Sequence, residues 1–332
     1  MGTPVPPPPD PPRRPPEYRH QLPPGAGGSP RPGDPDYDPL VPPPGPGLSP
    51  LYERLTATLG RSFRTLGVIL LLTFALPQFL LSLLGVAPSL QFGQTGFDVS
   101  SADPDRVETG PVVATLLIGL LVQLLVWFVN AVGWGAGIWA VTREAAGQPA
   151  PVGAALQVGL RRSGPMFGGF LLLTVMVLAG LLACVLPGLY LAVAGSLFSF
   201  VVIYERGRSG IGRSFGLVHR QFGAALGRVL LLVVTYLGVT LLVSCLLGLL
   251  SGSALPPGTP GGDSPEVATW LQVVTNLIGA AVDLPMTMLL LVGTLLTYTQ
   301  LRARKEPLST GQLQAAADQA AGGAPVEPGS AH

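Results

Sequence analysis

The chain of 332 residues contains 19 lysines and arginines, and beyond the first 50 residues most of them lie between long apolar runs. Residues 201–232 contain five of them. Large apolar residues recur there every three or four positions, while Arg213 and Arg220 share another face, which is typical of an amphipathic helix. Such a helix suits a membrane interface, with its arginines among headgroup phosphates. The apolar positions are Ile211, Phe215, Val218, Phe222 and Leu226.

Two further segments combine arginines with helical apolar spacing. In residues 51–66, Arg54 and Arg61 lie seven positions apart on one face, and residues 151–164 carry an adjacent arginine pair. Glu205 and Arg206 are predicted to form an ion pair that orients the bend between two spans. We predict that six arginines bind anionic lipid headgroups. They are Arg54, Arg61, Arg161, Arg162, Arg213 and Arg220.

Four polar residues interrupt the apolar runs: Asp283, Asn276, Asn130 and Gln123. An ionisable group inside hydrocarbon is by default a functional candidate. Counting roughly 20 residues back from Leu301 places Asp283 near the outer interface of a bilayer. We therefore favour a hydrated or hydrogen-bonded aspartate over a proton or substrate site, and the second reading stays open.

Catalytic chemistry is not indicated. The three histidines, His20, His219 and His332, form no cluster with carboxylates, and neither a nucleophile elbow nor a GxxxxGK[ST] phosphate loop occurs. We expect no catalytic residue, no metal and no cofactor. Cys184 and Cys245 are too few for a metal site, and whether they pair stays open.

The elements that position these residues follow from composition. Hydrophobic residues make up 48% and charged residues 11%, against about 25% charged in a soluble domain. Several uncharged runs approach or exceed the roughly 20 residues that cross a hydrocarbon core. We predict an all-α, polytopic membrane helix bundle of about six spans with basic interfacial helices. The expected spans are residues 66–85, 111–143, 167–185, 189–203, 225–250 and 267–301.

Three regions follow from this reading. Residues 1–50 hold about twenty of the 36 prolines and are predicted to be a disordered tail. Residues 51–305 form the transmembrane domain. Residues 306–332, rich in alanine and glycine, form a second disordered tail, with room for a short helix near Gln312.

Charge predicts the orientation. Arginine and lysine gather on one side of the spans, and the long loops of residues 87–110 and 251–266 are mainly acidic. By the positive-inside rule both termini face the cytoplasm.

A faint internal repeat is visible. Gly60-Arg61-Ser62-Phe63 recurs as Gly212-Arg213-Ser214-Phe215, with Arg161-Arg162-Ser163-Gly164 between them. A competing alignment of TLGVILLLT with ALGRVLLLVVT implies another register, so the repeat stays open.

Several short motifs lie around the bend and near the end of the last span. They are Pro187-Gly188 with Tyr190-Leu191, Tyr204-Glu205-Arg206-Gly207, Gly212-Arg213-Ser214-Phe215, Leu217-Val218, Phe222-Gly223, and Leu296-Thr297-Tyr298 with Leu301-Arg302. In these motifs the chain is similar to the bacterial membrane domain found fused to some glycerophosphodiester phosphodiesterases, which also occurs alone behind a proline-rich N-terminus. The resemblance covers about residues 51–305 and implies architecture, in a bacterial inner membrane, more than an activity. Thr299 and Gln300 stand where the family often has an acidic residue.

Two function classes follow. We favour a non-catalytic inner-membrane protein that binds anionic lipids, and protein partners through its proline-rich tail, in a scaffolding, regulatory or membrane-homeostasis role. The alternative is a transporter or permease-like component that moves a small solute or lipid. Membrane lipids are the expected partners, and no nucleic acid is expected.

Overall fold

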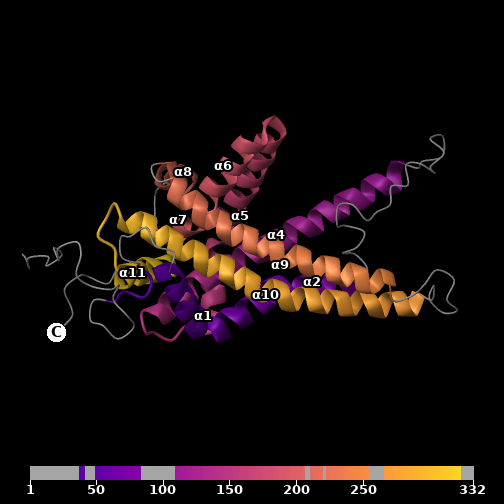
Figure 1. The fold of residues 1–332 in the computed structure, drawn as a ribbon, viewed down its shortest axis with the longest axis horizontal. Helices are drawn as coiled ribbons and strands as arrows, with labels where there is room; N and C mark the ends of the chain where they lie inside the picture. Colours follow the sequence, from indigo (N-terminus) through magenta and orange to yellow (C-terminus); the bar gives the residue numbers. More distant parts are fainter. Residues whose placement is uncertain are drawn as a thin grey trace, which may run out of the picture. The chain divides into compact units, whose positions relative to one another are not determined.

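The computed structural model describes residues 37–41, 49–83, 109–205, 210–219, 222–253 and 265–322. The described residues contain helices and no strand, so the predicted all-α membrane bundle is confirmed (Figure 1). The elements are α1 (Ser49–Leu70), the π-helical turn η1 (Leu71–Ala75), α2 (Leu76–Leu83), α4 (Thr109–Ala145), α5 (Val152–Ala183), α6 (Val185–Gly195), α7 (Phe198–Tyr204), α8 (Gly210–His219), α9 (Phe222–Ser253), α10 (Pro265–Ala303) and α11 (Thr310–Ala320).

Six helical stretches in the described residues are long and apolar enough to cross a membrane, as predicted. Many of their leucines point outward, such as Leu121 at 66% and Leu182 at 89% exposure. Outward apolar surface on this scale is stable only when hydrocarbon surrounds it. The stretches are Leu51–Leu81, Leu117–Ala145, Val152–Ala183, Val185–Tyr204, Leu226–Leu249 and Val273–Ala303.

Two of the predicted interfacial helices are not separate elements. Residues 51–66 belong to α1, which continues through η1 and α2, and residues 152–164 are the first half of α5. The third ends earlier than predicted, because α8 stops at His219 and Phe222 already begins α9. Helical periodicity alone does not reveal such boundaries, since an amphipathic stretch and an apolar span share the same 3.6-residue repeat.

The first span approaches α4 very closely at the π-helical turn. The Thr73 hydroxyl donates to the Ile69 carbonyl at 2.8 Å and is buried within the helix. A Cβ at Gly133 of α4 would collide with this threonine side chain. Glycine therefore lets the two backbones meet where η1 widens the helix.

The hairpin of α5 and α6 turns at a single residue. Cys184 is extended, with φ −173° and ψ 149°, and ends one helix while it precedes the next. The turn was predicted at residues 186–188, but Pro187 and Gly188 lie in the first turn of α6, where proline lacks only an N–H that needs no helical partner. Gly180 and Gly188 face each other without room for a Cβ. Figure 1 shows the two helices side by side.

The fourth span is broken in its buried part. It consists of α6 and α7, separated at Ser196 and Leu197, and was predicted as one helix. The buried Ser214 hydroxyl of α8 donates to the Ala194 carbonyl beside the break. A break at membrane depth is tolerated where other parts of the protein satisfy the freed backbone groups.

The tails predicted to be disordered contain packed residues. In α11, a capping box joins Ser309 and Gln312, and Leu313 and Ala317 are fully buried. This confirms the short helix expected near Gln312, and residues 306–322 are placed in the fold. Leu40, in the N-terminal tail, is also fully buried.

Asp38 links this N-terminal stretch to α11. Its carboxylate accepts from the backbone N–H of Thr310 at 2.8 Å and from the Thr310 hydroxyl at 2.5 Å. The hydroxyl of Thr299, near the end of α10, donates to the Leu40 carbonyl at 2.6 Å. The segments that flank the six spans therefore lie on the same side, as an even number of spans requires.

Candidate functional site

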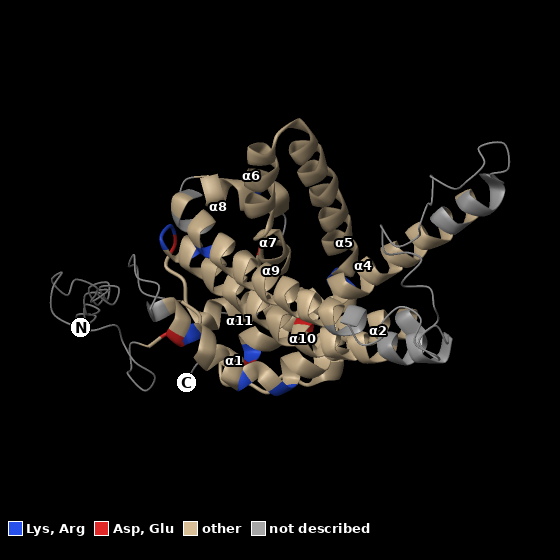
Figure 2. Cartoon of the chain, turned by 45° about the vertical axis from the view of Figure 1, so that its right-hand side comes forward, with Lys and Arg blue, Asp and Glu red and all other residues tan. Residues whose placement is uncertain are grey.

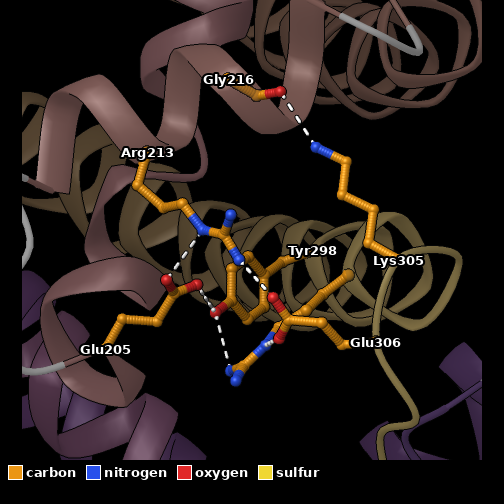
Figure 3. A network of polar contacts seen from close by, with 7 residues as sticks. Glu205, Arg213, Gly216, Tyr298, Lys305 and Glu306 are labelled. Carbon is orange, nitrogen blue, oxygen red and sulfur yellow. Dashed lines mark hydrogen bonds and ion pairs between the residues drawn. The ribbon is translucent and has the colours of Figure 1, made fainter.

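Five side chains at the ends of α7, α8 and α10 form a closed polar ring (Figure 3). Arg213 donates from Nε to Glu205 at 2.9 Å and from Nη2 to Glu306 at 2.8 Å. Arg302 donates from Nε to Glu306 at 3.3 Å and from Nη1 to the Tyr298 hydroxyl at 3.2 Å. The Tyr298 hydroxyl donates to Oε1 of Glu205 at 2.9 Å and closes the ring.

The ring holds two carboxylates and two guanidinium groups, so its formal charge is zero. The Glu205 side chain is only 6% exposed, whereas that of Glu306 is 42% exposed. Burial alone would lower the pKa of Arg213, but its bonds to Glu306 and Glu205 outweigh burial and raise that pKa. Burial opposes ionisation of Glu306 as well, yet Arg213 and Arg302 hold its pKa below the usual range. The ring is suited to holding three helix ends together, not to transferring a proton.

Aromatic stacking fixes the position of Tyr298 in the polar ring. The Tyr298 ring stacks between Phe200 and Tyr204 of α7, with centroid distances of 5.6 and 5.7 Å. The Tyr204 hydroxyl is hydrogen-bonded to the Thr142 hydroxyl of α4 at 2.5 Å. Stacking and hydrogen bonding thus orient the Tyr298 hydroxyl towards Glu205.

The Gly212-Arg213-Ser214-Phe215 motif has a distinct contact for each side chain it carries. Arg213 joins the ring, Ser214 binds the Ala194 carbonyl, and Phe215 packs edge-on against Tyr190 at 6.0 Å. Nearby, Lys305 Nζ donates to the Gly216 carbonyl at 3.1 Å. These contacts explain why α8 stays packed against the fourth span and the end of α10.

Several arginines predicted to bind lipid are engaged within the protein instead. Arg54 is 3% exposed, which contradicts its predicted place among headgroups. Arg161 and Arg162 donate to the carbonyls of Ala321 and Ala320 at the C-terminal end of α11. Cations there also oppose the negative end of the helix dipole. Arg213 is held in the ring, and Arg206 and Arg220 lie outside the described residues.

The burial of Arg54 has a physical reason. In a membrane the apolar face of a helix can point to lipid, so a polar row can face the protein. Apolar residues at helical spacing in residues 51–66 include Phe63, which is 60% exposed. The buried face combines apolar and polar residues: Leu51, Arg54, Leu55, Thr58, Ser62 and Leu66.

The outward face of α1 keeps the interfacial character that the sequence predicted. Arg61 is exposed there, as are Arg64, Tyr52 and Phe63. Counting about 20 residues back from Leu83 places Arg64 at the edge of a hydrocarbon core about 30 Å thick. Aromatic and basic side chains at this depth are typical of a membrane interface. In Figure 2 the charged residues gather around α1, α8 and α11.

A polar cavity of about 280 Å³ lies between the first span, α4, α9 and α10. It brings together Asp283 and Asn130, two of the four polar residues singled out from the sequence, whereas Asn276 and Gln123 do not line it. The lining residues are Phe74, Ala75, Gln78, Asn130, Tyr236, Ala280, Asp283, Leu284 and Thr287.

The cavity gives Asp283 polar neighbours. Asn130 and Tyr236, which share it, lie near the middle of their apolar stretches, and Asp283 itself is exposed. A hydrated aspartate and a proton or substrate site both fit this position, so both readings stay open. Gln78, Tyr236 and Thr287 were missed, since isolated polar residues in apolar runs carry no sequence signal of convergence.

In the described residues, Cys184 and Cys245 are both free thiols, and no three side chains of His, Cys, Asp or Glu gather as metal ligands do. No protein-family model matches this chain, and no curated protein and no solved structure is similar enough to be matched to it. The resemblance to the phosphodiesterase-linked membrane domain therefore depends on the motif residues alone and stays a prediction.

Proposed function

We propose that this protein is a non-catalytic integral membrane protein that binds anionic lipid headgroups through the outward face of α1. The six apolar helices are consistent with an integral membrane protein. The observation that supports lipid binding is the exposed arginine pair, Arg61 and Arg64, beside the exposed Phe63. The arginines would lie among phosphates while the aromatic ring enters the acyl region.

The test uses the purified protein in nanodiscs that contain phosphatidylglycerol and phosphatidylcholine. Arg61→Gln with Arg64→Gln should reduce the enrichment of retained phosphatidylglycerol, measured by native mass spectrometry, because each basic residue near the surface contributes about 1 kcal/mol of attraction. Thr56→Ala, on the exposed side of the same helix, is the matched control. Unchanged enrichment in the double variant would contradict the proposal.

A scaffolding, regulatory or membrane-homeostasis role is the function we attach to this lipid binding. We also propose that the protein lies in a bacterial inner membrane with both termini in the cytoplasm. It would belong to the phosphodiesterase-linked membrane-domain family, and its proline-rich tail would bind a protein partner. The basic residues around α1, α8 and α11 support the cytoplasmic placement of that side. The cytoplasmic placement can be tested in intact cells with a membrane-impermeant thiol reagent. The variant carries Gly311→Cys in a Cys184→Ser/Cys245→Ser background. Labelling of the introduced thiol in intact cells would contradict the cytoplasmic placement.

The intramembrane cavity favours a second candidate, a permease-like component. A broken fourth span and a polar cavity between helices are features that transporters share. Flux of a solute in proteoliposomes that Asp283→Asn abolishes, with the fold intact, would reverse the order of the two candidates.

A further inference from the structure

The cavity around Asp283 has the dimensions of a binding site. Its volume of about 280 Å³ exceeds the roughly 150 Å³ of an engineered protein cavity that holds benzene. It is bounded by four separate spans, and Phe74 and Ala75 come from the π-helical turn η1. Turns of this kind occur frequently at functional sites.

The charge in this cavity is uncompensated. Asp283 has no salt bridge among the described residues, and none of the residues that line the cavity is Lys, Arg or His. Asp283 is an exposed residue that lines this cavity, and an unpaired carboxylate among apolar spans favours a cation beside it.

The neutral groups around Asp283 also favour a cation. Gln78, Tyr236 and Thr287 line the same cavity, and their side-chain oxygens can accept hydrogen bonds from an ammonium group. The rings of Phe74 and Tyr236 border the same space, and aromatic faces attract organic cations.

We propose that this cavity binds a small organic ammonium ion, with Asp283 as its counter-charge and neutral side-chain oxygens of the lining as hydrogen-bond acceptors. Only Asp283 among the lining side chains carries a charge, whereas sites for Ca²⁺ gather six to eight oxygen ligands, usually from several carboxylates, at about 2.3–2.6 Å. The width of the cavity and its aromatic lining instead suit a cation with attached carbon. This inference is independent of lipid binding by the outward face of α1.

The ammonium group could belong to a soluble amine or to the headgroup of an aminophospholipid. Both present the same chemistry to Asp283, so the test has two arms. In the first, the full-length protein in lipid-free detergent micelles is titrated with ethanolammonium chloride. In the second, nanodiscs with and without phosphatidylethanolamine are compared.

The first arm follows the thermal unfolding midpoint at constant ionic strength, with sodium chloride and the neutral analogue ethylene glycol as reference solutes. Ethanolammonium should raise the midpoint saturably, and Asp283→Asn should weaken its binding by about fivefold, as expected for the loss of one partner of a partly exposed charge pair. Asn130→Leu should weaken binding to a smaller extent. Asn276 is a polar residue of α10 that does not line the cavity, so Asn276→Leu should leave binding unchanged.

Each outcome decides the proposal. Equal stabilisation by sodium chloride, or unchanged binding in Asp283→Asn, would overturn it. If Asp283→Asn does not fold, binding that survives in Asn130→Leu and in Tyr236→Leu with unchanged affinity would overturn it as well. Stabilisation only by phosphatidylethanolamine nanodiscs, lost in the cavity variants, would assign the site to the lipid headgroup. A response to the soluble salt would assign it to a free amine.

Discussion

The Tyr298 hydroxyl donates to Oε1 of Glu205 across 93 positions of sequence, at 2.9 Å. This single bond joins the end of α7 to the last span, and the same hydroxyl accepts from Arg302. Glu205 is almost fully buried, so its charge depends on the donors that surround it. The polar ring is therefore a structural joint whose parts should be tested individually.

Tyr298→Phe should destabilise the protein by about 1–3 kcal/mol, because it leaves a buried carboxylate oxygen without its tyrosine donor. The aromatic stacking with Phe200 and Tyr204 would be retained. Chemical unfolding in detergent measures the change. Tyr52→Phe, at a hydroxyl-bearing ring that is 69% exposed, is the control and should have almost no effect. Equal stability of the two variants would show that the Tyr298 hydroxyl does not support Glu205.

Arg213→Gln should destabilise more than Glu306→Gln. Arg213 is the partner of the buried Glu205, whereas the Glu306 side chain is 42% exposed and its pairs are screened by solvent. Unfolding midpoints of the two variants give the comparison. Arg61→Gln, on the exposed side of α1, controls for the loss of a positive charge. If Glu306→Gln destabilised the protein more than Arg213→Gln, the exposed ion pairs of Glu306 would contribute more to stability than the buried pair of Glu205.

The contribution of Glu306 should depend on pH. Its pKa is lower in the folded protein than in the unfolded chain, so its stabilisation is complete above the ordinary glutamate pKa of about 4.3 and disappears as the pH falls through the depressed value. The difference in midpoint between the wild type and Glu306→Gln should thus be constant near pH 7 and shrink below about pH 4. A difference that grows on acidification would contradict this sign.

Asp38→Ala should loosen α11. The variant loses the carboxylate that accepts from the Thr310 N–H and hydroxyl, and also from the N–H groups of Leu40 and Val41. A cost of about 1 kcal/mol is expected for a cap of this type. Hydrogen exchange of α11 amides should accelerate about fivefold, whereas Gly311→Ala, which meets no crowding, should slow it. Unchanged exchange in Asp38→Ala would show that the contact does not hold the helix.

Gly159→Ala should destabilise the contact of α4 and α5 by about 1–3 kcal/mol, because a Cβ there collides with the backbone carbonyl of Val132. Gly153→Ala lies on the same helix in open space and should be neutral or slightly stabilising. Thermal unfolding in one detergent gives both values. If both substitutions were equally tolerated, the helices would have to separate more easily than the packing indicates.

The sequence predicted the spans well because hydrocarbon imposes a simple rule on length and polarity. It also singled out Glu205, Arg213, Tyr298 and Arg302, although not their connection. The side of a helix that faces the protein was harder to predict, because leucine is equally stable against lipid and against other helices. Arg54 is an example, since it lies on the buried side of α1. Contacts of the tails, such as Asp38 with Thr310, depend on packing that local composition does not encode.

The bond between Asp38 and Thr310 spans 272 positions, which is most of the chain. Thr310 follows all six membrane-capable stretches and Asp38 precedes them, so the contact requires all six to be in the chain and packed together. Loss of the contact therefore reports on misplacement of any of the six stretches and not only on a change at α11.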